Sequence, residues 1–153
     1  MIRHTNFVRH SVAAITALLA FSASLPAFAD DAMPSPDAVY KEVETTLGGV
    51  PTFVKQVPKA AIAGFWALER DLELSDKTAL DAKTKALISL AVASQIPCQY
   101  CIWADTHTLK QLGATDEEIG EAVSMAGLTR YASTTFNGLQ VDFDTFKKEM
   151  GGD

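Results

Sequence analysis

The sequence lacks the features that mark several large classes of protein. After residue 30 no segment approaches the roughly 20 apolar residues that a membrane-spanning helix needs. There is no run of basic residues and no stripe of basic and aromatic residues, so nothing supports binding to nucleic acid. There is also no internal repeat and no sustained alternation of apolar and polar residues, which argues against strands. We therefore expect a soluble all-α protein with neither a membrane nor a nucleic acid as partner.

The first 29 residues have the parts of a secretory signal peptide. Arg3 and Arg9 give a positive start, and residues 12–21 form a largely apolar stretch. Pro26 precedes a small-x-small cleavage site at residues 27–29. The apolar stretch is too short for a membrane anchor, so we expect removal of residues 1–29. The mature chain, residues 30–153, has the size of one domain, and we expect it in the periplasm or outside the cell.

The mature chain is acidic and contains little that suits a metal or a histidine-based reaction. All 19 acidic residues but only 11 of the 13 basic ones lie in it, which leaves a net charge of −8. We interpret this charge as a solvated surface that aids solubility. His107 is the only histidine after the signal. We expect no metal and no cofactor.

Capping residues and breakers predict a bundle of about six helices. Residues 86–93 read ALISLAVA, apolar almost all round apart from Ser89, so this helix should be central and buried. A capping box at Thr115 and Glu118 starts a later helix. The expected helices cover residues 35–48, 58–72, 81–95, 98–113, 115 to about 126, and about 131–150, the last open to interruption at Asn137-Gly138, with a short turn near 53–54.

The two cysteines, Cys98 and Cys101, are the one evident reactive centre. A disulfide between them closes so short a loop that the chain-entropy model gives it roughly 2 kcal/mol at best, so close pairing indicates chemistry more than architecture. At about 100° per residue, both cysteines share a mainly apolar helix stripe with Asp105, whereas His107 lies on the opposite side. Tyr100 also faces away from the stripe.

Several interpretations of this centre remain open. A dithiol three residues apart suits redox exchange, in which one sulfur attacks and the other resolves the intermediate. An inert disulfide, or two buried thiols, is the plainer alternative. A zinc site would want four ligands, and Cys98, Cys101 and Asp105 supply three. Asp105 can act as a general base, or it can be a buried acid bonded to the backbone or to Tyr100.

The run from residue 80 to 119 resembles the AhpD-like branch of the carboxymuconolactone decarboxylase family. The resemblance rests on Cys98-Gln-Tyr-Cys101 and on the stretch Gly113-Ala-Thr-Asp-Glu-Glu-Ile119 that follows twelve residues later. It implies an all-helical domain that assembles as a trimer or a larger homo-oligomer. It also implies a thiol peroxidase that reduces hydroperoxides and is re-reduced by a partner dithiol protein.

The resemblance assigns roles to both cysteines. Cys101 matches the cysteine that attacks peroxide, and Cys98 matches the one that resolves it, although a helix N-terminus would favour the thiolate at Cys98. The family histidine is replaced by Asp105, with His107 out of register by two, and the family glutamate is replaced by Ala86. The usual Glu–Cys–His proton relay therefore lacks both of its other members.

Three functions follow from these observations. The first is an exported dithiol oxidoreductase acting on a hydroperoxide or a disulfide, with Cys101, Cys98 and Asp105 as catalytic residues and Tyr100 and His107 as supporting ones. The second is a redox-silent oligomeric binding or scaffold protein with an inert disulfide. The third is a lactone decarboxylase, against which the cysteine pair argues.

Overall fold

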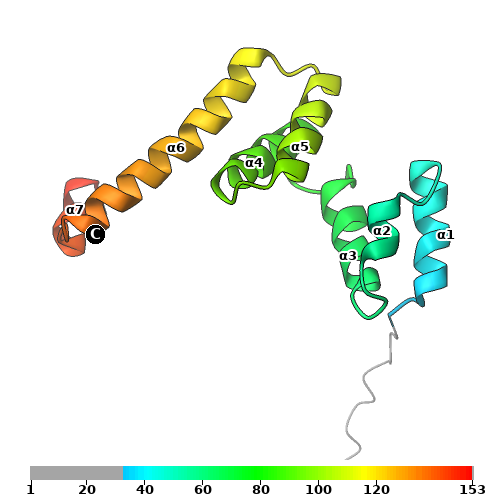
Figure 1. Ribbon diagram of the computed structural model, residues 1–153. Coiled ribbons are helices and arrows are strands. Elements are labelled where there is room, and N and C mark those ends of the chain that lie inside the picture. The colour runs from blue at the N-terminus through cyan, green and yellow to red at the C-terminus, as the bar shows by residue number, and fades with distance from the viewer. Residues whose placement is uncertain (1–32, 153) are drawn as a thin grey trace, which may run out of the picture. The chain divides into compact units, whose positions relative to one another are not determined.

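The structure, a computed structural model, describes residues 33–152 (Figure 1). The expected signal peptide lies outside the described residues. The described chain is all-α, as predicted, and contains no strand. Its elements are α1 (Pro36–Leu47), α2 (Thr52–Gln56), α3 (Ile62–Leu68), a π-helical turn η1 (Glu69–Glu73), α4 (Ala82–Gln95), α5 (Gln99–Gln111), α6 (Asp116–Gly138) and α7 (Phe143–Glu149).

The helix starts that the sequence predicts from capping residues are confirmed. The Ser35 hydroxyl accepts a hydrogen bond from the Ala38 backbone N–H at 3.3 Å, and α1 follows. The Asp81 carboxylate accepts from the backbone N–H at residue 84 at the start of α4, at 2.7 Å. At α6 both bonds of the predicted capping box form, at 2.8 and 3.1 Å. These contacts satisfy backbone donors that the first turn of a helix otherwise leaves open.

Two clusters of buried side chains hold the helices together. The first joins α1, α2 and α3 through Val39, Val43, Val54, Ile62, Ala63 and Trp66. The second joins α4, α5 and the start of α6 through Ala86, Leu90, Leu109 and Ala114. α4 contacts both α5 and α6 (Figure 1). Ile102, the residue after Cys101, packs against this second cluster.

The helix over residues 86–93 is less buried than predicted, because two of its eight residues are exposed. Leu90 and Ala93 are buried, but Ile88 and Val92 are 50% and 54% exposed. The reason is that α5 and α6 cover one side of α4, while no described element covers the side of Ile88 and Val92. An apolar pattern round a helix thus predicts burial, but it does not identify which element or chain covers each side of the helix.

Three predicted boundaries also differ from the structure. One continuous helix, α6, replaces the predicted helix that starts at residue 115 and the first part of the predicted last helix, because no proline interrupts residues 116–138. It ends at Asn137-Gly138, where the sequence predicts an interruption. Pro58 begins a turn, and the helix itself starts at Ile62. That helix then passes into η1, so the described residues hold seven α-helices and one π-helical turn where about six helices were predicted.

Within residues 33–152 no helix combines the length and the apolarity needed to cross a bilayer.

Candidate functional site

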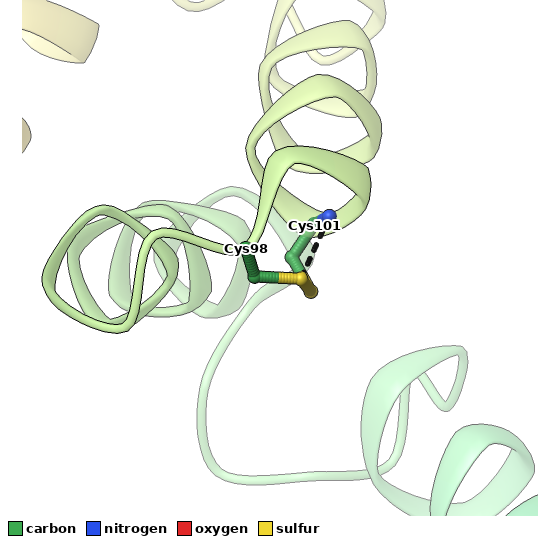
Figure 2. The surroundings of a disulfide bond; sticks show 2 residues. All are labelled: Cys98 and Cys101. Carbon is green, nitrogen blue, oxygen red and sulfur yellow. Dashed lines mark hydrogen bonds between the residues drawn. A yellow bond between two sulfur atoms is a disulfide. The ribbon is translucent and has the colours of Figure 1, made fainter.

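The two cysteines lie at the start of α5 and form a disulfide. Cys98 is the N-cap residue of α5, and Cys101 occupies its first turn, with the two Cα atoms 5.4 Å apart. The Cys98 sulfur accepts a hydrogen bond from the Cys101 backbone N–H at 3.3 Å (Figure 2). Both side chains are half-buried, so a small molecule can reach them. A sulfur at this position is stabilised as a thiolate by the free N–H groups and the dipole of the helix.

The sequence places Cys98 there through a tight connection between α4 and α5. α4 ends at Gln95, and only Ile96 and Pro97 separate it from Cys98. The Cys98 backbone N–H donates to the Ala93 carbonyl at 3.0 Å, and its carbonyl accepts from the backbone N–H of Ile102 at 2.9 Å. The end of one helix and the start of the next therefore hold the cysteine backbone from both sides.

Asp105 is the buried carboxyl on this side of α5, as the helical periodicity predicts. It lies one turn after Cys101 and is 9% exposed, and its Oδ2 atom is buried with no hydrogen-bond partner. Burial raises the pKa of Asp105, and the Ser89 hydroxyl on α4 opposes this with a weaker lowering effect. A carboxyl that resists ionisation is suited to hold and release a proton.

Glu69 is the residue that sequence reasoning missed. It begins η1, far from the cysteines in the sequence, and is half-buried. Burial raises its pKa, and the negative charges of Glu73 and Asp105 raise it further. Glu69 therefore belongs to the same electrostatic environment as Asp105. The π-helical turn is the structural signal, since such turns are frequent at functional sites, but spacing along the sequence gives no hint of it.

Tyr100 and His107, predicted as supporting residues, lie away from the disulfide. Tyr100 is 79% exposed. The His107 ring stacks on Trp103 with centroids 5.1 Å apart, and its Nε2 lies 3.1 Å from the Gln111 side-chain nitrogen. Trp103 and His107 line an open hollow of about 530 Å³ along α5, and Tyr100 does not. The geometry brings neither residue to the sulfurs.

The described residues contain no group of three or more His, Cys, Asp and Glu side chains arranged to hold a metal ion. The site is thus a disulfide at the start of α5, with the buried carboxyl of Asp105 one turn later on the same helix.

Fold and site together define a class: all-α proteins that carry a Cys-x-x-Cys disulfide at the start of a helix. The chain belongs to the carboxymuconolactone decarboxylase family, whose family model matches residues 60–141, more than half of its 153 residues. Its fold is AhpD-like. The crystal structure of the alkylhydroperoxidase AhpD core from Rhodospirillum rubrum superposes with a TM-score of 0.61 at 23% identity, covering 72% of this chain and 83% of that one.

A curated relative adds a local similarity in sequence. "Uncharacterized protein 4 in cox locus" of Paracoccus denitrificans is 42% identical over 52 residues, which are 34% of this chain and 47% of that protein. The match thus spans about half the length of that relative.

Proposed function

We propose that the protein is a thiol-dependent peroxidase that reduces hydroperoxides through a dithiol–disulfide cycle of Cys98 and Cys101. The observation that carries this proposal is the half-buried disulfide at the N-terminus of α5, with a buried carboxyl one turn away. Membership of the carboxymuconolactone decarboxylase family and an AhpD-like fold support it. No metal and no cofactor takes part in the proposed cycle.

The cycle balances with the two thiols as the sole reductant. The Cys101 thiolate attacks the terminal oxygen of the hydroperoxide, the O–O bond breaks, and the alkoxide that leaves takes up a proton. Cys101 is oxidised to a sulfenic acid. Cys98 then attacks that sulfur, the S–O bond breaks, and water leaves as the disulfide forms. A partner dithiol protein would reduce the disulfide and restore both thiols.

The proposal predicts a fast loss of two thiols when the reduced protein meets peroxide. Mixed with an equimolar organic hydroperoxide, the wild type should lose both thiols together and at least ten-fold faster than an unhindered free thiol. Counting free thiols against time measures this, with the doubly substituted Cys98→Ser, Cys101→Ser protein as the blank. Thiol loss no faster than that of the free thiol would leave an inert disulfide in an oligomeric scaffold as the better interpretation.

Residues 1–29 support a second part of the proposal, that the protein is exported. A positive start, an apolar stretch and a small-x-small site are the elements that secretion machinery recognises and cleaves. In the periplasm or outside the cell, a disulfide such as Cys98–Cys101 persists unless a dedicated reductant opens it.

We also propose that the protein works as a homo-oligomer, a trimer or larger. None of the 23 residues of α6 is buried, although the helix carries exposed Met125, Leu128 and Tyr131. Ile88 and Val92 of α4 are uncovered as well. Helices in proteins gain most of their stability from packing an apolar face, so α6 and the uncovered side of α4 suit contact with further copies of the chain.

The oligomer proposal predicts that charges on the uncovered side of α4 dissociate the assembly. We expect the wild type to have the mass of a trimer or more, and the Ile88→Asp, Val92→Asp protein to shift to monomer, because two carboxylates cannot be buried there unpaired. Light scattering coupled to gel filtration measures the mass. Leu47→Asp, an equally exposed leucine on α1, is the matched control and should leave the mass unchanged. A monomeric wild type would contradict the proposal.

A further inference from the structure

The exposed surface around the two cysteines is uncharged, in a chain with 19 acidic residues. Within residues 96–107 the exposed side chains, which we call the collar, are those of Ile96, Pro97, Gln99, Tyr100, Trp103, Ala104 and His107. Three of them are large and mostly exposed: Ile96 at 65%, Tyr100 at 79% and Trp103 at 70%. The segment contains no lysine or arginine, and its one acidic residue, Asp105, is buried.

The collar has the composition of the centre of a protein–protein interface. Such centres are depleted of charged residues and enriched in tyrosine and tryptophan. The Trp103 ring also stacks on the His107 ring, with centroids 5.1 Å apart and planes only 7° from parallel. A ring held in this way loses little conformational freedom when a partner covers it. Both rings line the hollow along α5, into which a side chain of a partner can protrude.

The disulfide within the collar indicates what covers this surface. A half-buried disulfide in an oxidising compartment stays closed until a reductant reaches it. A protein partner covers about 800 Å² in a typical interface, and Tyr100 and Trp103 each lie within two residues of a cysteine. A protein thiol that reaches the sulfurs therefore brings its surface onto the collar. A permanent contact with another copy would instead close the disulfide off, and the contact proposed between copies includes no collar residue.

We infer that the collar is the docking surface for the protein that reduces the Cys98–Cys101 disulfide, and that this partner carries its dithiol in an uncharged, apolar surface. The inference rests on the proposed thiol cycle and names the surface that its reductant contacts. A charged partner surface would lose its hydration on the collar without gaining a counter-charge, whereas an apolar one gains from covering Tyr100 and Trp103.

The reduction itself is a thiol–disulfide exchange that balances with the partner dithiol alone. A thiolate of the partner attacks the Cys101 sulfur, the bond between Cys98 and Cys101 breaks, and Cys98 leaves as a thiolate. The Cys101 backbone N–H, 3.3 Å from the Cys98 sulfur, stabilises that charge. The second thiol of the partner then attacks the partner's own sulfur in the mixed disulfide and releases Cys101. The partner ends as a disulfide, and its two protons pass to Cys98 and Cys101.

Reduction of the oxidised protein without any peroxide tests the docking surface. The probes are reduced thioredoxin, a protein with a Cys-x-x-Cys dithiol, and dithiothreitol, a small dithiol that covers no collar. Acid quenching, alkylation and mass spectrometry count the thiols formed on this chain against time. We expect thioredoxin to react at least ten-fold faster than dithiothreitol at equal concentration. Trp103→Glu and Tyr100→Glu should each slow thioredoxin by about ten-fold and leave the rate with dithiothreitol nearly unchanged.

Phe53→Glu is the matched control, because it changes an aromatic residue of similar exposure on α2, and it should alter neither rate. Thermal unfolding of all three variants controls for damage to the fold. Thioredoxin that reacts no faster than dithiothreitol would overturn the inference, and so would equal slowing of both probes, which would assign the effect to the sulfurs themselves.

Two further outcomes separate this inference from the other proposals. A lower mass of Trp103→Glu or Tyr100→Glu in gel filtration would assign the collar to contact between copies and overturn the inference. The expected rates with thioredoxin, in a protein whose reduced thiols do not react with peroxide, would support the docking surface and contradict the proposed peroxidase instead.

Discussion

Replacement of Cys101 by serine should abolish fast peroxide reduction, and replacement of Cys98 should leave it half complete. In Cys101→Ser the rate of peroxide consumption should fall by about two orders of magnitude or more, because the attacking sulfur is gone. In Cys98→Ser the first step should proceed at nearly the wild-type rate and stop at a sulfenic acid on Cys101, since no thiol is left to resolve it. Dimedone trapping followed by mass spectrometry detects that acid, and stopped-flow measurements give the rates.

The structure makes this comparison informative, because it gives each sulfur a different advantage. Cys98 accepts a hydrogen bond from the Cys101 backbone N–H and lies at the helix N-terminus, which favours its thiolate. Cys101 lies one turn before Asp105, which favours proton transfer. If Cys98→Ser were the inactive variant and Cys101→Ser the one that accumulates a sulfenic acid, the assignment of roles would be reversed. Matching thermal unfolding of both variants controls for damage to the fold.

Features that depend on near neighbours in the sequence could be predicted from it. Ser35, Asp81 and Thr115 cap helices because their side chains reach backbone N–H groups three residues later, whatever the rest of the fold does. The burial of Asp105 and the outward position of His107 follow from helical periodicity alone. The part of the site that lies on α5 could therefore be predicted from the sequence.

Features that depend on tertiary contacts could not be predicted. The charge of Asp105 raises the pKa of Glu69, and no spacing rule connects residues that far apart in the sequence. The exposed side of α4 was missed for a related reason. An apolar pattern predicts that Ile88 and Val92 are covered, but it does not distinguish a contact within the chain from a contact with another copy.

Lys85 is a buried lysine on α4 whose ammonium group binds oxygens of η1 and of the loop after it. It is buried, and its Nζ atom donates to the carbonyls of Leu72 and Ser75 at 2.8 and 2.7 Å and to the Thr78 hydroxyl at 3.0 Å. These bonds tie the end of η1 and the following loop to α4. A buried ammonium group persists only where its donors are satisfied, and the three oxygens provide this.

Lys85→Met should therefore lower the free energy of unfolding by about 2–4 kcal/mol, because methionine fills the space of the stem but leaves three acceptors without a charged donor. Urea unfolding measures the loss. Lys83→Met is the matched control: it lies two residues earlier on α4 and breaks a partly exposed 2.6 Å pair with Glu118, so it should cost about 0–1 kcal/mol. Equal losses in the two variants would show that the buried bonds contribute no more than a surface ion pair.

The same variant should loosen η1 and the loop that follows it. Once residues 72–78 are free of α4, the amide protons of η1 should exchange with solvent faster, because the bonds of Lys85 no longer hold this segment. Hydrogen exchange measures the effect, and Lys83→Met should leave the exchange of η1 unchanged. Exchange of η1 at the wild-type rate in Lys85→Met would show that other contacts hold the segment on α4.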